Sequence, residues 1–94
     1  MTQQYFTNAK APTLNEHYDA TVSATTEITL DTGTSVIEVT AIDKGIFMKW
    51  GAAATSSDFD EFIGANQTRQ YAVQAGTVQF IEEAATAKLV VIEK

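Results

Sequence analysis

The feature that most constrains the fold is a pattern of short alternating segments from about residue 26 to residue 94. In "SVIEVTAI", Ile37, Val39 and Ala41 fall on one face of an extended chain, and Glu38 and Thr40 on the other. Because successive side chains of a β-strand point to opposite faces, this alternation is typical of a half-buried strand. Similar runs, rich in Val, Ile, Thr and aromatic residues and broken by Gly, Asp or Asn, follow at intervals of about ten residues.

These runs predict seven strands, at residues 26–30, 35–42, 46–50, 60–65, 68–73, 77–83 and 88–94. Such a series predicts an all-β chain, folded as a small antiparallel β-sandwich of the jelly-roll or immunoglobulin-like type. A helix competes in "FIEEAATAKLVVIEK", which contains good helix formers. Its consecutive β-branched residues "VVI" favour a strand, and we keep the all-β interpretation.

The first part of the chain differs in character from the rest. Residues 1–25 are polar and show no steady period, so we expect an extended N-terminal arm followed by a sandwich domain at 26–94. The arm is either a solvated terminus or a segment that packs along a neighbouring subunit. The second interpretation rests on four large side chains, more than a solvated tail needs. These anchors are Tyr5, Phe6, Leu14 and Tyr18.

Length and charge limit the class of partner. A chain of 94 residues fits one domain with a thin core, which oligomerisation often supplements. A formal net charge of −6 argues against nonspecific nucleic-acid binding and against an anionic membrane surface. The chain has no cysteine, its start lacks a secretory signal pattern, and its apolar run "LVVI" is too short to span a bilayer. We therefore expect synthesis in the cytoplasm, with no nucleic acid or membrane as partner.

No residue pattern points to catalysis, a cofactor or a metal site. His17 is expected to be an exposed or packed loop residue, because no motif places a nucleophile beside it. Asp58 and Asp60 are spaced like calcium ligands, but the next alternate positions carry no oxygen ligand, so a solvated acidic loop is preferred over a weak cation site. Glu82 and Glu83 are adjacent and point to opposite faces of a strand, which separates them. We predict that the chain is not an enzyme.

The segment "IFMKW" supplies the most informative aromatic residues. Phe47 and Lys49 share one face, and Ile46, Met48 and Trp50 share the other. An unpaired lysine is costly to bury, so the Phe47 and Lys49 face is expected to point outward or toward a partner. Trp50 then belongs to the core, with an exposed platform for sugar stacking as the alternative.

The order of segments resembles a family of small bacteriophage structural proteins. It is carried by "TEITLDTGTSVIEVTA", then "GIFMKWG", the loop "AAATSSDFDEFIGA", "TRQYAV", and "GTVQFIEEAATAKLVVIEK". The resemblance covers residues 26–94 and is one of strands and turns rather than of a catalytic signature. Members more often have "PAG" where this chain has "IGANQ". The family implies a β-sandwich found on phage particles, encoded among capsid and head–tail genes, and offers no active site.

The resemblance implies a noncatalytic virion protein, made in the host bacterial cytoplasm. It would be a capsid decoration (cement) protein or a head–tail accessory protein that binds a repeated lattice of capsid or head–tail proteins. We expect a homo-oligomer, with the arm anchors, Phe47 and Lys49 as interface residues. The alternative is a carbohydrate-binding or receptor-binding β-sandwich module of a phage fibre.

Overall fold

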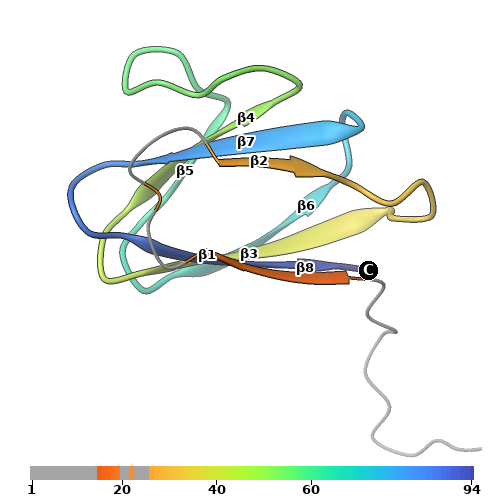
Figure 1. Cartoon of the computed structure of the whole chain (residues 1–94), viewed down its shortest axis with the longest axis horizontal. Coiled ribbons are helices and arrows are strands. Elements are labelled where there is room, and N and C mark those ends of the chain that lie inside the picture. Colours follow the sequence, from red (N-terminus) through yellow and green to blue (C-terminus); the bar gives the residue numbers. More distant parts are fainter. Residues whose placement is uncertain (1–14, 20–21, 23–25) are drawn as a thin grey trace, which may run out of the picture.

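The computed structural model describes residues 15–19, 22 and 26–94. Their strands form two stacked antiparallel sheets, and no helix is present in this part of the chain (Figure 1). The first, called the β3 sheet, has the order β1-β8-β3-β6 and consists of β1 (Asn15–Asp19), β8 (Lys88–Glu93), β3 (Val36–Ile42) and β6 (Thr68–Ala72). The second, called the β4 sheet, has the order β2-β7-β4-β5 and consists of β2 (Thr26–Thr29), β7 (Thr77–Glu82), β4 (Ile46–Trp50) and β5 (Glu61–Ile63). The predicted all-β sandwich is confirmed.

The strand pairing follows a simple rule. β1 pairs with β8, β2 with β7, β3 with β6 and β4 with β5, all antiparallel. This is the pairing of one long hairpin whose midpoint lies between β4 and β5. Two further pairings, β3 with β8 and β4 with β7, roll the hairpin into two layers. Apart from β4 and β5, consecutive strands therefore lie in different sheets.

Seven strands of the structure match strands predicted from the sequence, and one strand has no predicted counterpart. β4 has the predicted bounds, and the other six predicted strands begin or end within two residues of their predicted limits. The eighth, β1, lies inside residues 1–25, where an arm is predicted, and pairs with β8. Residues 15–19 therefore belong to the β3 sheet, whereas 1–14, 20–21 and 23–25 lie outside the described residues.

The core lies between the two sheets and is built by the predicted alternation. In β3 every second residue is buried, and β7 and β8 show the same period of two. The buried apolar side chains include Ile28, Ile37, Val39, Ala41, Ile46, Met48, Ile63, Val78, Phe80, Leu89 and Val91. Full burial of an aliphatic or phenylalanine side chain contributes about 1.5–3 kcal/mol, so this layer supplies most of the favourable free energy of folding.

Two turns at one end of the sandwich brace each other. Asp43, between β3 and β4, and Asn66, between β5 and β6, both have positive φ, of 74° and 60°. Asn and Asp enter this left-handed region more readily than other non-glycine residues. The Asp43 N–H donates to Asn66 Oδ1 at 3.0 Å. This hydrogen bond links the β3–β4 turn to the β5–β6 turn.

Candidate functional site

A buried carboxylate, Glu93, is the centre of a polar cluster inside the sandwich. Glu93 is the last residue of β8 and shares its inner face with Leu89 and Val91, and its exposed fraction is 0%. Its Oε1 accepts hydrogen bonds from the Thr34 hydroxyl at 2.6 Å and the Asp31 N–H at 2.7 Å. Its Oε2 lies 2.5 Å from Nε2 of the His17 ring, which is 34% exposed. The cluster ties β1 and the β2–β3 turn to β8.

The environment of Glu93 acts on its pKa in two directions. Burial raises the pKa of the carboxyl, because the charged form loses its hydration. The hydrogen bonds from Thr34, His17 and the Asp31 N–H stabilise the charged form and outweigh burial, so the pKa of Glu93 lies below its ordinary value. Glu93 is therefore a carboxylate at neutral pH.

The arrangement of this cluster suits bracing rather than nucleophilic catalysis. In a catalytic triad the base lies between the hydroxyl and the acid. Here the carboxylate of Glu93 lies between Thr34 and His17, with one oxygen bonded to each. The imidazole is therefore not placed to take the proton of the threonine. The prediction that His17 is a loop residue is wrong, because His17 lies in β1 and its ring contacts Glu93.

The first exposed apolar surface lies on the outer face of the β4 sheet. Phe47 of β4 is paired with Phe62 of β5 on one side and with Ile81 of β7 on the other. The Phe47 ring centroid lies 5.1 Å from that of Phe62 and 4.7 Å from that of Phe59 in the β4–β5 loop. Phe59 and Phe62 are 40% and 39% exposed. These four residues, Phe47, Phe59, Phe62 and Ile81, are called the aromatic patch.

A glycine makes room for one edge of the aromatic patch. A Cβ atom added to Gly45 would lie 2.4 Å from Cζ of Phe62 and 2.8 Å from Oε1 of Glu83. The Phe62 ring therefore lies directly over the Gly45 backbone, and the Glu83 carboxylate borders the patch. The turn between β3 and β4 therefore provides the space that the exposed Phe62 ring occupies.

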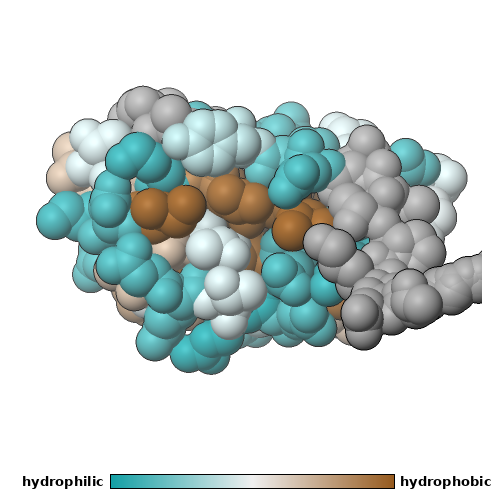
Figure 2. All heavy atoms as spheres, turned by 90° about the horizontal axis from the view of Figure 1, so that it is seen from below, coloured by the Kyte–Doolittle hydropathy of each residue, from teal (hydrophilic) through white to brown (hydrophobic). Residues whose placement is uncertain are grey.

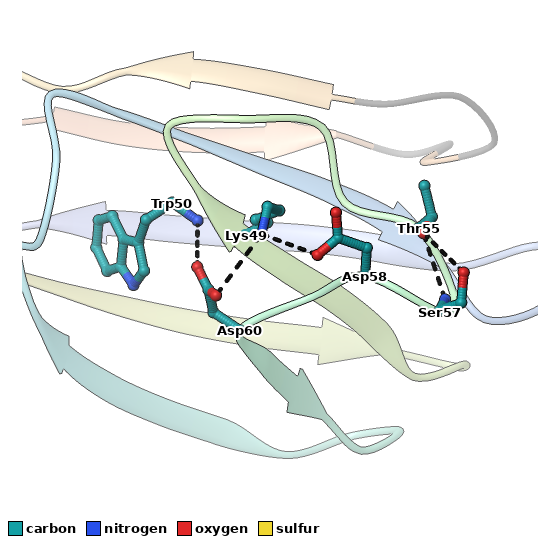
Figure 3. A network of polar contacts seen from close by, with 6 residues as sticks. All are labelled: Lys49, Trp50, Thr55, Ser57, Asp58 and Asp60. Atoms are coloured by element: carbon teal, nitrogen blue, oxygen red, sulfur yellow. Dashed lines mark hydrogen bonds and ion pairs between the residues drawn. The ribbon is translucent and has the colours of Figure 1, made fainter.

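The other border of the aromatic patch is an ordered acidic loop (Figure 3). Lys49 Nζ lies 2.9 Å from Asp58 Oδ1 and 3.9 Å from Asp60 Oδ1, and the Trp50 N–H donates to Asp60 Oδ2 at 2.9 Å. The hydrogen bond to Asp58 raises the pKa of Lys49, so the lysine stays charged. The tip of the loop is closed by the Thr55 N–H, which donates to the Asp58 carbonyl at 2.9 Å. The two aspartates thus bind the lysine of the neighbouring strand.

The second exposed apolar surface lies on the outer face of the β3 sheet. Ile42 of β3 and Val90 and Ile92 of β8 alternate with buried residues and are half-exposed on this face. Tyr18 of β1 is paired with Val90 and is 62% exposed. Figure 2 views the molecule from this side and shows apolar atoms running along the middle of the face, between hydrophilic ones. These four residues, Tyr18, Ile42, Val90 and Ile92, are called the apolar stripe.

Four charged groups beside the apolar stripe form two ion pairs. Lys94 Nζ lies 3.0 Å from Glu38 Oε1, and Lys88 Nζ lies 2.6 Å from Asp43 Oδ2. The hydrogen bond with Asp43 raises the pKa of Lys88. Glu16, which is exposed and paired in register with Ile92, adds a further carboxylate, so this face carries two ion pairs and an additional acidic group.

The predicted interface residues are divided between these two surfaces. Tyr18 belongs to the apolar stripe, and Phe47 and Lys49 point outward from the β4 sheet as the alternation of "IFMKW" predicts. Trp50 is half-buried and packs against the core, in agreement with its predicted inward orientation. The remaining predicted anchors, Tyr5, Phe6 and Leu14, lie outside the described residues.

Sequence reasoning missed the Glu93 cluster and the convergence of Phe59 and Phe62 on Phe47. Within the described residues, no group of three or more histidine or acidic side chains is placed to hold a metal ion. In the same part of the chain, no helix has the length and hydropathy that spanning a membrane requires. Comparison with models of known protein families, with curated proteins and with solved structures finds no match to this chain.

Proposed function

We propose that this protein is a noncatalytic structural component of a bacteriophage virion. It acts as a capsid decoration protein or a head–tail accessory protein that binds a repeated protein lattice on the particle. It is made in the host bacterial cytoplasm and assembles as a homo-oligomer. The sequence resemblance to small phage structural proteins is one support, and the strand pairing and the two outer faces are the others.

The strand pairing supports a jelly roll rather than an immunoglobulin-like sandwich. A jelly roll has eight strands in two sheets and arises when one long antiparallel hairpin is rolled up. The pairs β1–β8, β2–β7, β3–β6 and β4–β5 are those of such a hairpin. Viral capsid domains and lectins use this architecture, which is compatible with a virion role.

The observation that carries the proposal is that both outer faces of the sandwich bear apolar side chains. An antiparallel sheet with one face in water normally places polar residues on that face. Here the aromatic patch lies on one outer face and the apolar stripe on the other. A protein packed between neighbours in an assembly is expected to have such faces.

The apolar stripe is the better surface for contact between copies of this chain. Four of its neighbouring charges are compensated in the pairs Glu38–Lys94 and Lys88–Asp43, and Glu16 adds one acidic group. Two copies packed through this face therefore bring little like-charge repulsion together, whereas the aromatic patch would place acidic groups opposite acidic groups. We expect sedimentation equilibrium to give an oligomer that Tyr18→Ser with Ile92→Thr dissociates and that Thr68→Ser, a polar change on the same face, leaves intact.

The central test of the proposed function is binding to particles. Purified protein is mixed with phage capsids, the particles are sedimented, and the bound protein is measured. We expect saturable co-sedimentation with a fixed number of copies per particle. Protein that stays in the supernatant at micromolar concentration would count against the proposal.

The second candidate, a carbohydrate-binding or receptor-binding module of a phage fibre, is favoured by the exposure of Phe59 and Phe62, because exposed aromatic rings stack on sugars. Trp50, considered above as a platform for sugar stacking, packs against the core, and so does Tyr71. Glycan-array binding that Phe59→Ser abolishes would favour this candidate. Acrylamide quenching of Trp50 fluorescence is expected to be weak in either case.

A further inference from the structure

We propose that the aromatic patch binds a cationic protein segment that also carries apolar side chains. The inference deepens the proposed function, on which it rests for the source of the segment, a protein of the particle lattice. The residues that form the surface are the same whatever the source of the segment. It consists of the four residues of the patch and the acidic groups that border it.

The apolar part of the surface is preformed. Phe62, Phe47 and Ile81 lie in one row across three adjacent strands, and the Phe59 ring is held against Phe47 at 4.7 Å. Neither exposed ring depends on a long flexible loop, because the loop that carries Phe59 is tied to β4 by Asp60 and Asp58. A partner therefore finds the rings in place and little ordering entropy opposes binding.

The charges around the patch indicate which sign of charge the partner carries. Asp58 and Asp60 flank Phe59, and Glu83 approaches the Phe62 ring. Lys49 lies within this group and is already bound by the two aspartates. Lys44, in the turn next to Gly45, adds one more cation but leaves the acidic groups in excess.

This excess of acidic groups favours some possible occupants of the patch over others. A second copy of the chain has a net charge of −6 and would place the same acidic groups opposite each other. A nucleic acid is repelled for the same reason. A segment in which Lys or Arg alternates with Leu, Ile or Phe places its apolar residues on the rings and its cations on the surrounding carboxylates. The geometry thus favours a cationic apolar segment over both other occupants.

The first experiment measures binding of a defined probe to the full chain. The probe is a fluorescein-labelled peptide in which lysine and leucine alternate, and its affinity is measured by fluorescence anisotropy. Two matched peptides replace lysine by glutamate or leucine by serine. We expect micromolar binding of the lysine–leucine peptide only, weakened as salt is raised from about 0.05 to about 0.5 M. Failure of that peptide to bind, or equal binding of either matched peptide, would overturn the proposal.

Variants locate the binding to the patch. Phe59→Ser combined with Phe62→Ser removes two rings that are exposed, and binding is expected to weaken about tenfold. Glu83→Gln is expected to weaken it less and to reduce its salt dependence. Thr68→Ser is the control, a change of an exposed residue on the opposite face, and should bind as the wild type does. Circular dichroism and thermal unfolding confirm that each variant is folded. Unchanged binding by the double phenylalanine variant would refute the assignment.

The same variants on particles separate this inference from the proposed function. If the protein binds the peptide but not capsids, the virion role fails and the cationic segment belongs to another protein. If it binds capsids and the double phenylalanine variant binds them equally well, the virion role stands and the inference is wrong. If that variant instead loses self-association, the patch is a contact between copies and the inference is also wrong.

Discussion

Replacement of Glu93 by alanine is predicted to be the most damaging change of a charged residue among those that the structure describes. The substitution leaves three donors without their acceptor: the Thr34 hydroxyl, the Asp31 N–H and the His17 ring. The hydroxyl of Thr34 is buried, and an unsatisfied buried donor costs about 1–3 kcal/mol. His17 and Asp31 are partly exposed and regain hydrogen bonds with water, so they add less.

These contributions sum to a loss of about 3 kcal/mol in the free energy of unfolding, within the range of about 3–5 kcal/mol for breaking a buried pair. For a domain of this size, that corresponds to a fall in Tm of about 12–24 °C, since 1 kcal/mol shifts Tm by about 4–8 °C. Glu93→Gln keeps one acceptor oxygen for Thr34 and Asp31 and is expected to cost less, about 1–2 kcal/mol.

The pH dependence gives this prediction a second readout. The folded pKa of Glu93 is lowered, so its contribution to stability is complete above the ordinary glutamate pKa, about 4.3, and is lost as pH falls through the folded pKa. The difference in unfolding free energy between wild type and Glu93→Gln should therefore be present at about pH 5 and shrink below about pH 4.

The assay is urea unfolding followed by circular dichroism, at several pH values. The matched control is Glu38→Gln, in the half-exposed pair with Lys94, which is expected to cost less than about 1 kcal/mol. The reasoning about Glu93 would be refuted if Glu93→Ala cost no more than Glu38→Gln, or if the Glu93→Gln difference were the same at about pH 3 as at about pH 7.

Three further predictions follow from the turns, the acidic loop and the N-terminal residues. Asn66→Ala should have a free energy of unfolding about 1 kcal/mol lower than Asn66→Gly. Both variants lose the side-chain hydrogen bond to Asp43, but only alanine disfavours the positive φ of this position. Equal urea midpoints of the two variants would contradict this prediction. Asp60→Ala, which frees the Trp50 N–H, should cost about 1 kcal/mol, whereas Asp58→Ala, which breaks an exposed ion pair, should change unfolding free energy by less than about 0.5 kcal/mol. Deletion of residues 1–14, which carry the predicted anchors Tyr5, Phe6 and Leu14, should weaken co-sedimentation with capsids, and unaltered co-sedimentation would remove these anchors from the proposed interface.

Alternation in the sequence was enough to predict most strands and their buried faces. "SVIEVTAI" and "IFMKW" follow a period of two with large apolar residues on one face, and the structure buries those faces. β1 was missed because its inward side chains include His17 and Asp19 rather than apolar residues. An edge strand with polar inward residues is held by pairing with β8 and by the bond to Glu93, neither of which its own sequence reveals.

The buried carboxylate illustrates what one strand can and cannot indicate. Alternation from Leu89 and Val91 places Glu93 on the core face, and that conflict was the available signal for a buried polar cluster. Its partners were out of reach, because His17 and Thr34 are 76 and 59 residues away along the chain. The aromatic patch has the same limit. Phe47 was predicted to face outward, but the approach of Phe59 depends on how the β4–β5 loop folds back.

The difference in charge between the two outer faces suggests an order for the proposed contacts. The apolar stripe has two compensated ion pairs and one further acidic group, Glu16, beside it, so contact between copies through it depends mainly on apolar burial and responds less to salt. The aromatic patch has excess acidic groups, so its contact with a cationic segment weakens as salt is raised. Copies joined through the stripe would present two acidic patches facing away from each other, and two linked weak sites bind a repeated lattice far better than one. Rising salt should therefore release the protein from particles as intact oligomers. Release as monomers would contradict the assignment of self-association to the apolar stripe and of lattice binding to the aromatic patch.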